Sequence, residues 1–191
     1  MNPDILIHDT AVIEKGAVIG PGTRIWHFTH LMPRASVGKD CILGQNVFLG
    51  NQTSVGDRVK IQNNVSLYEG VIIEDDVFLG PSAVFTNVIN PRSFLERKHE
   101  FKTTLIRKGA TIGANATIIC GVEVGAYAMV GAGSVITKNV KSFALVYGNP
   151  AIQHGWVSRN AYKLIFNDKG EATCPSSGER YQLVNGTVNL I

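Results

Sequence analysis

Cysteine is scarce in this chain, which excludes a fold held together by disulfides. The 191 residues contain three cysteines, Cys41, Cys120 and Cys174, which stand far apart and are odd in number. A disulfide framework needs an even set of closely spaced cysteines. We therefore expect a protein that works in a reducing, cytoplasmic setting.

Long apolar runs and a basic leader are missing as well. The first residues, MNPDILIHD, contain neither a basic segment nor an apolar segment of the kind that forms a signal peptide. No run approaches the ~18 apolar residues that a transmembrane helix needs. Charged residues make up 17% of the chain, and the net charge is +3. The composition favours neither a nucleic-acid nor a membrane partner, although it slightly favours anionic small molecules.

What the chain has instead is a six-residue repeat. Every sixth residue from Ile7 to Phe85 is aliphatic or aromatic, and the series resumes from Ile106 to Ile136. Four residues after nearly every member stands a small or β-branched residue. No helix has a period of six, and a simple strand alternates by two. The repeat predicts a parallel β-helix in which each six-residue unit is one short strand plus a turn.

Three such units make one triangular coil of about 18 residues. Strands of neighbouring coils lie ~4.8 Å apart, so about seven coils would form a prism roughly 30 Å tall. The hexad residues and their partners four positions later should point inward and stack in columns. Glycines such as Gly38 and Gly56 directly follow an inward residue, and we expect the backbone to turn tightly there.

The repeat breaks once, at residues 86–105. A loop of this length that leaves a rigid coil is usually functional, although a tolerated surface insertion is the alternative. Arg92, Arg97, Lys98 and Lys102 make it basic, as a lid that faces phosphates would be. We therefore expect a β-helix domain over 1–140 with this loop inserted.

Residues 141–191 should form a cap, because an open coil end is a sheet edge that needs covering. We expect a turn at YGNPA (147–151) and then a short helix over 152–166. Its apolar residues Trp156, Leu164 and Ile165 would cover the last coil.

The tail indicates a hairpin, with strands near 171–174 and 180–190. Turns are expected at Ser177-Gly178 and Asn185-Gly186. Cys174-Pro175 before Ser177-Gly178 is like half of a zinc knuckle. One cysteine cannot hold a structural zinc, so we interpret this segment as a plain hairpin.

Five stretches are distinctive: IWHFTH (25–30), YEGVIIEDDVFLGPSAVFTNVINPRS (68–93), GANATIICGVEVG (113–125), VGAGSVITKNV (130–140) and YGNPA. They resemble segments of the hexapeptide-repeat nucleotide-sugar N-acetyltransferases, which are trimers of left-handed parallel β-helices. With the tail segment CPSSGERYQL, they are most similar to the bacterial enzymes that acetylate the 3-amino group of UDP-2-acetamido-3-amino-2,3-dideoxy-glucuronate. Enzymes for dTDP-3-amino-3,6-dideoxyhexoses share much of the pattern.

The resemblance implies a homotrimer that binds acetyl-CoA in the groove between neighbouring prisms, without a metal. Its biological role would be to supply a diacetamido uronate sugar for lipopolysaccharide O-antigen or a similar surface glycan. The residues placed along the CoA groove are Gly113, Ala114, Gly131, Ala132, Asn149 and Pro150. Lys138 and Lys141 would meet the nucleotide phosphates, or they are solvated surface lysines.

Asn87 is the main catalytic candidate. Positions 18 apart stack on one edge of the prism, so Asn87 should lie one coil above Glu69 and two above Asn51. An amide there can orient an amine or bind the thioester oxygen through hydrogen bonds. The alternative is a structural asparagine ladder. The FTN sequence that ends at Asn87 is part of the family resemblance and favours the functional role.

The reaction needs a neutral amine that attacks the thioester carbonyl, and a sugar amine does not require a strong base. None of the five histidines, His8, His27, His30, His99 and His154, sits in the central coils beside Asn87. We therefore predict catalysis by positioning, with the CoA thiolate as the final proton acceptor. Glu69 is the second base candidate.

Substrate binding is assigned to residues near the expected site. His27 and His30 would meet the substrate or a subunit interface, and either one is an alternative general base. Arginine forks suit a carboxylate or a diphosphate, and a tyrosine ring can stack on a base or a sugar. The remaining candidates are Arg34, Gln62, Asn63, Tyr68 and Arg92, and each could equally be an ordinary surface or turn residue.

Three other functions remain open. The acceptor could be a dTDP-linked amino sugar or a hydroxyl group, although a hydroxyl would need a firmer base. A carbonic-anhydrase-like zinc site needs three histidines at a subunit interface, and the spacing of His27, His30 and His99 does not obviously supply it. A non-catalytic scaffold would have no use for the basic loop or for YGNPA.

Overall fold

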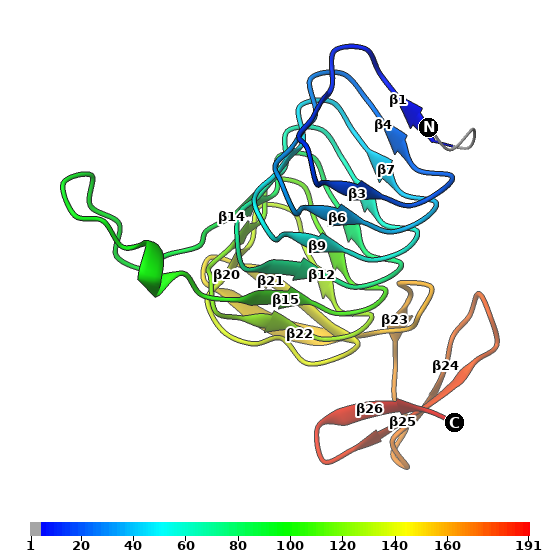
Figure 1. Cartoon of the computed structure of the whole chain (residues 1–191). Helices are drawn as coiled ribbons and strands as arrows, with labels where there is room; N and C mark the ends of the chain where they lie inside the picture. Colours follow the sequence, from blue (N-terminus) through cyan, green and yellow to red (C-terminus); the bar gives the residue numbers. More distant parts are fainter. Residues whose placement is uncertain (1–4) are drawn as a thin grey trace.

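The computed structural model describes residues 5–191, and its main body is a three-sided prism of stacked coils (Figure 1). The coils begin at the N-terminal end, and the C-terminal strands lie beyond the last coil. The predicted all-β fold, a left-handed parallel β-helix, is confirmed. Part of the segment inspected for a leader, residues 1–4, lies outside the described residues.

Each side of the prism is one sheet. Sheet A contains β1 (Leu6–Ile7), β4 (Arg24–Ile25), β7 (Ile42–Leu43), β10 (Lys60–Ile61), β13 (Phe78–Leu79), β16 (Thr111–Ile112), β19 (Met129–Val130), β21 (Ala144–Gly148), β22 (Ala151–Val157) and β23 (Lys163–Leu164). Sheet B contains β2 (Val12–Ile13), β5 (His30–Leu31), β8 (Phe48–Leu49), β11 (Ser66–Leu67), β14 (Val84–Phe85), β17 (Thr117–Ile118) and β20 (Val135–Ile136). Sheet C contains β3 (Val18–Ile19), β6 (Ser36–Val37), β9 (Ser54–Val55), β12 (Val71–Ile73), β15 (Thr104–Ile106) and β18 (Glu123–Val124).

Inward columns of aliphatic side chains hold the coils in register. Ile61 is fully buried and pairs with Leu43 below and Leu79 above. The partners four positions later are buried too, as predicted, and the polar ones among them are satisfied. Thr29, for example, donates its hydroxyl hydrogen to the carbonyl of Gly44 at 3.0 Å. Each fully buried aliphatic side chain contributes roughly 1.5–3 kcal/mol.

The expected role of the glycines that follow inward residues is wrong. Positive φ occurs three positions after the inward residue, and most of these turns use other residue types, such as Phe28 and Arg34 with φ of 56° and 63°. The glycines serve the approach of neighbouring coils instead. A Cβ at Gly20 would lie 2.6 Å from the backbone carbon of Gly38, a distance that no side chain tolerates.

The interruption is a loop that projects away from the prism (Figure 1). It leaves after β14 and returns at β15, whose first residue is Thr104. Its regular structure is one short 3₁₀ turn, η1 (Lys98–Glu100), and a bridge between Arg92 and Leu95. Within residues 5–191 no helix has the length and apolar character to cross a membrane.

The predicted helix over 152–166 is wrong. β21 extends sheet A by pairing parallel with β19, and β22 folds back antiparallel along β21. The free edge of β21 offers backbone hydrogen bonds that a helix could not use. Trp156 packs against the prism core as expected, whereas Leu164 joins a separate cluster and Ile165 is 80% exposed.

The tail forms three strands rather than the two predicted. They are β24 (Glu171–Thr173), β25 (Arg180–Val184) and β26 (Thr187–Leu190), joined in an antiparallel sheet. The predicted turn at Asn185-Gly186 divides the second expected strand, since both residues have positive φ. Cys174 is a free, buried cysteine in the small core of this sheet.

Arg159 ties this sheet to the prism. Its backbone N–H donates to the Tyr181 hydroxyl at 3.0 Å, and its guanidinium donates to Glu179 at 3.3 Å. The same guanidinium donates to the hydroxyl of Tyr127, a turn residue of the prism, at 3.1 Å. The Tyr181 hydroxyl in turn donates to Glu179 at 2.7 Å. The four residues therefore form one connected clamp.

The clamp predicts acid-sensitive stability. The hydrogen bond from Tyr181, with that from Arg159, lowers the pKa of Glu179. A lowered folded-state pKa stabilises the fold above the ordinary glutamate pKa of about 4.3, and this contribution is lost as pH falls through the folded-state value. Glu179→Gln should therefore lower the melting temperature at pH 7, and the difference from wild type should shrink as the pH falls. An equal difference at pH 7 and at pH 3 in thermal melts would contradict this account.

Candidate active site

Apart from Lys141, the predicted site residues occupy two edges of the prism and the face between them. The B/C edge consists of the turns that leave sheet B, at residues 32–35, 50–53, 68–70 and 86–103. The A/B edge consists of the turns that enter sheet B, at residues 26–29, 44–47, 62–65, 80–83, 113–116 and 131–134.

The B/C edge stacks the catalytic candidates. Ser66 pairs with Phe48 on one side and with Val84 on the other. The residues three positions further along are Asn51, Glu69 and Asn87, so they occupy equivalent places in three successive coils. The sequence-derived order of these three turns is therefore the order in the structure.

The backbone at Asn87 is fixed at the neck of the loop. Its carbonyl accepts a hydrogen bond from the Lys102 N–H at 2.9 Å, which closes the loop on itself. The preceding Thr86 donates its N–H to the Ile118 carbonyl, and its hydroxyl accepts from the Cys120 N–H at 2.9 Å. A rigid coil thus holds the point from which the Asn87 side chain projects.

The three stacked side chains have unused hydrogen-bonding capacity. Within residues 5–191, the partly exposed side chains of Asn87 and Glu69 form no hydrogen bond or ion pair, and the buried Oδ1 of Asn51 also lacks a partner. Buried polar atoms are normally paired. Sequence reasoning placed Asn51 in the stack without choosing it as a candidate, although its 18-residue spacing was the available signal.

The histidines lie elsewhere. His27 stacks on His8 at 3.5 Å between ring centroids on the A/B edge, and His154 stacks on Tyr147 at 3.6 Å. His30 points outward from β5 and bonds Glu14 at 3.1 Å. His99 lies in the loop itself, on η1. Apart from His99, no histidine within residues 5–191 belongs to the strands or turns that carry Glu69 and Asn87.

Gln62 and Asn63 lie on the A/B edge, away from Asn87. The Asn63 side-chain oxygen accepts the Gln45 N–H of the coil below at 2.9 Å. It therefore acts as a ladder residue that ties two coils together. Gln62 projects from the same turn and is partly exposed.

Six of the residues assigned to CoA gather on the A/B edge, at its C-terminal end, whereas Lys138 and Lys141 lie elsewhere. Gly113-Ala114 and Gly131-Ala132 occupy equivalent turns of successive coils, and Asn149-Pro150 form the turn after β21. A Cβ at Gly131 would lie 2.7 Å from the Cβ of Tyr147. Glycine and alanine occupy the first two positions of both coil turns, so a ligand can approach the backbone there closely.

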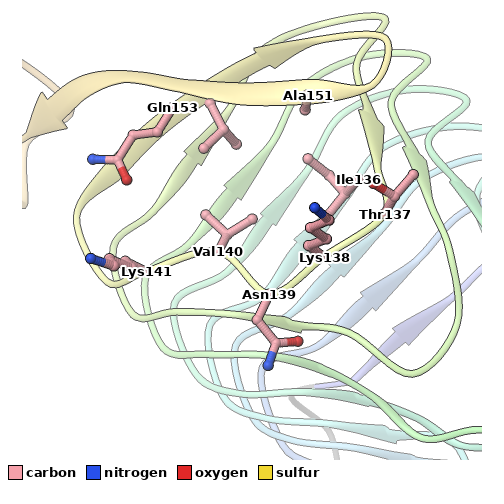
Figure 2. Close-up of a pocket in the computed structure, with 9 residues that line it drawn as sticks. Ile136, Thr137, Lys138, Asn139, Val140, Lys141, Ala151 and Gln153 are labelled. Carbon is pink, nitrogen blue, oxygen red and sulfur yellow. The ribbon is translucent and has the colours of Figure 1, made fainter.

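Lys138 and Lys141, the two lysines expected to meet phosphates, border a cavity of about 200 Å³ under β22. Figure 2 shows Lys138 and Lys141 on either side of Val140, with Ala151 and Gln153 above them. Lys141 donates to the Gly186 carbonyl at 2.8 Å and so binds the C-terminal sheet. Lys138 is exposed and forms no ion pair within the described chain.

The remaining candidates lie on or beside the B/C edge. Tyr68 is 40% exposed and directly precedes Glu69. Arg34 is an exposed turn residue two coils below. Arg92 is exposed in the loop, where its guanidinium donates to the Pro91 carbonyl at 3.0 Å. Residues 5–191 contain no cluster of three histidine, cysteine, aspartate or glutamate residues suited to a metal ion.

Comparison with known proteins agrees with this architecture. The family described as bacterial transferase hexapeptide (six repeats) matches residues 16–51, 52–87 and 103–138, and the hexapeptide repeat of succinyl-transferase matches 34–69. The dTDP-3-amino-3,6-dideoxy-alpha-D-galactopyranose 3-N-acetyltransferase of Aneurinibacillus thermoaerophilus is 44% identical over 185 residues, covering 97% of this chain and 94% of that protein.

The chain belongs to the bacterial hexapeptide-repeat transferases.

This hexapeptide-repeat transferase is an N-acetyltransferase, and acetyl-CoA is its acetyl donor. A serine acetyltransferase of Buchnera aphidicola is 40% identical over 93 residues, which cover 49% of this chain and 32% of that one. Among solved structures, an N-acyltransferase of Bacillus cereus in complex with dTDP and coenzyme A has a TM-score of 0.49 at 19% identity. It covers 83% of this chain and 84% of the other. The Aneurinibacillus relative, which matches nearly the whole chain, confirms the enzyme class expected from the sequence.

The row of small residues on the A/B edge predicts where bulk should interfere with acetyl-CoA. Ala132→Trp should raise the KM for acetyl-CoA about tenfold while the protein stays folded. Ala126→Trp is the matched control, because Ala126 has the equivalent turn position in the same coil on another edge. Steady-state kinetics with varied acetyl-CoA measure both. Equal KM values for acetyl-CoA in the two variants would show that acetyl-CoA does not bind along the A/B edge.

Proposed function

We propose that the enzyme transfers the acetyl group of acetyl-CoA to the 3-amino group of a nucleotide-linked amino sugar. The observation that carries this proposal is the Aneurinibacillus relative, whose alignment covers nearly the whole chain and which acts on such a sugar. The unpaired polar row of the B/C edge supplies groups suited to an amine and to a thioester.

Asn87 acts by positioning in this proposal. Its amide orients the neutral amine, whose lone pair attacks the thioester carbonyl carbon. The new C–N bond forms, the C–S bond breaks, and the amine loses one proton as CoA leaves as a thiolate. The thiolate takes that proton, directly or after it has passed through the Glu69 carboxylate.

The working form in this proposal is a homotrimer. The catalytic candidates Asn87 and Glu69 lie on the B/C edge of a chain, whereas the small residues assigned to CoA lie on its A/B edge. The face of sheet B separates these edges within one copy. A neighbouring copy that places its A/B edge against this B/C edge would complete the site, as closed cyclic assemblies commonly do.

For the sugar nucleotide we propose UDP-2-acetamido-3-amino-2,3-dideoxy-glucuronate. The segments FTNVINPRS and CPSSGERYQL support it by resemblance. The exposed guanidiniums of Arg34 and Arg92, which have no carboxylate partner in residues 5–191, also suit the C6 carboxylate of a uronate. A dTDP-3-amino-3,6-dideoxyhexose is the second candidate, favoured by the substrate of the 44% identical relative.

Replacement of Asn87 should lower kcat more than replacement of Glu69. Asn87→Ala should lower kcat about 100-fold, the usual cost of removing one preorganised hydrogen-bond donor. Glu69→Gln should cost less than about tenfold, because the thiolate can accept the proton. Asn90→Ala, in the same loop, is the matched control and should be silent. A silent Asn87→Ala combined with a 100-fold loss in Glu69→Gln would reverse the assignment; both results come from thiol-release kinetics.

The two sugar candidates are separated by release of free CoA from acetyl-CoA. We expect kcat/KM for the UDP-uronate to exceed that for the dTDP-dideoxyhexose by about 100-fold, since the uronate carboxylate can pair with an arginine. Arg34→Ala and Arg92→Ala should each reduce this ratio of the two kcat/KM values. Preference for the dTDP sugar would keep the reaction and discard the uronate. Turnover of neither amino sugar would refute the proposed function.

A further inference from the structure

The outer face of sheet B carries one column of side chains, the first residue of each strand. From the N-terminal end the column is Val12, His30, Phe48, Ser66, Val84, Thr117 and Val135. Ser66 is a small residue between the larger Phe48 and Val84, and it pairs with both. A small residue within a column of larger ones leaves a depression in the face.

Three rings form a row that leads to that depression from its N-terminal side, and the last of them, Tyr68, lines it. The edge of the His30 ring meets Phe48 at 5.6 Å between centroids and 73° between planes. Phe48 and Tyr68 lie 6.0 Å apart at 54°. Tyr68 comes from the B/C edge, so the rings connect the sheet face to the turn that carries Glu69.

The depression itself is a cavity of about 180 Å³. Its lining includes Ser66, Tyr68 and Val84, with Asn64, Ala83 and Phe85 around them. The Ser66 hydroxyl forms no hydrogen bond within the described chain. A space of this size holds one six-membered ring, with an aromatic ring beside it and a hydroxyl at its floor.

The spacing of these features matches the shape of a nucleotide sugar. The ring pair of His30 and Phe48 lies two coils below the pair of Ser66 and Val84 in the column, so roughly 10 Å separate their levels. A diphosphate bridge separates a nucleobase from its sugar by a comparable length. The exposed Arg34 follows the strand of His30 at the B/C edge, so a cation lies at the N-terminal end of that span.

We propose that this face is the binding site for the nucleotide half of the substrate. The nucleobase stacks on Phe48, with the His30 ring at its edge, and the amino sugar occupies the cavity over Ser66 beside Tyr68. The sugar amine then points toward Asn87. This inference rests on the proposed function and extends it, because it assigns Phe48 and Ser66 to substrate recognition.

Glu14 is a positioning residue in this arrangement. Its carboxylate bonds the His30 Nε2 at 3.1 Å and fixes the ring orientation, as carboxylate partners of histidine commonly do. The other ring nitrogen forms no hydrogen bond within residues 5–191. It is therefore free to bond a carbonyl or N–H on the edge of a pyrimidine.

The first test is Phe48→Leu against Phe78→Leu. Phe78 projects outward from sheet A and is the matched control on another face. Loss of base stacking should raise the KM for the sugar nucleotide, and the Kd for UDP alone, about tenfold in Phe48→Leu. The KM for acetyl-CoA and the kcat should stay unchanged, and Phe78→Leu should behave like wild type.

The second test fills the cavity. Ser66→Leu places a larger side chain in a column that already accepts valine and phenylalanine, so folding should be preserved. It should raise the KM for the sugar nucleotide at least tenfold and leave UDP binding within about twofold. Ser54→Leu is the control, since Ser54 has the same outward strand position on sheet C.

The outcomes separate this inference from the proposed function. Normal KM values in both Phe48→Leu and Ser66→Leu, in an enzyme that acetylates amino sugars, would overturn the binding face alone. Equal increases in the KM for acetyl-CoA, or dissociation of the assembly in size-exclusion chromatography, would also overturn it, because the column would then be a packing surface between copies. A wild-type protein that turns over no amino sugar would refute the function first.

Discussion

The register between coils is the constraint on which the rest of the structure depends. Each inward aliphatic side chain stacks on its equivalents in the next coils, as Ile61 does between Leu43 and Leu79. A slip of one residue would turn an inward column toward water. Coils in this register approach so closely that a glycine is required after several inward residues, as at Gly20. The hexad repeat therefore supplies the side chains of the core and also sets the spacing of equivalent residues along each edge of the prism.

Because the register is fixed, residues at equivalent positions of successive coils stack into rows. Asn51, Glu69 and Asn87 lie above one another because each follows its strand by the same number of residues. The small residues of the A/B edge line up for the same reason. Neither row curves toward the other within one chain, so an active site that uses both requires a second copy. The proposed homotrimer supplies that second copy.

The inserted loop and the cap use the ends of this regular body. The loop leaves the prism where Thr86 and Asn87 are held by backbone bonds, so a variable segment begins from a rigid point. The C-terminal sheet has its own small core and contacts the prism through Arg159 and Tyr127. Rigid coils thus position the candidate catalytic residues. The loop extends outward from the prism, and the C-terminal strands cover its last coil.

The period of six was sufficient to predict the coils, the inward columns and the stacking of Asn87 on Glu69, because all three follow from local spacing. The left-handed turn residues escaped prediction, since the position is filled by types as different as Phe28 and Arg34. β22 was mistaken for a helix because its partner, the free edge of β21, is created only by the fold. The unpaired Asn51 oxygen and the ring column of sheet B likewise depend on neighbours 18 residues away.

The most direct test of a site shared between copies is co-expression of Asn87→Ala with Ala132→Trp chains, assayed at low acetyl-CoA. Mixed assemblies should recover about one quarter of wild-type activity, the statistical share of sites with two intact edges. Activity no greater than the sum of the separate variants would contradict a site built from two chains.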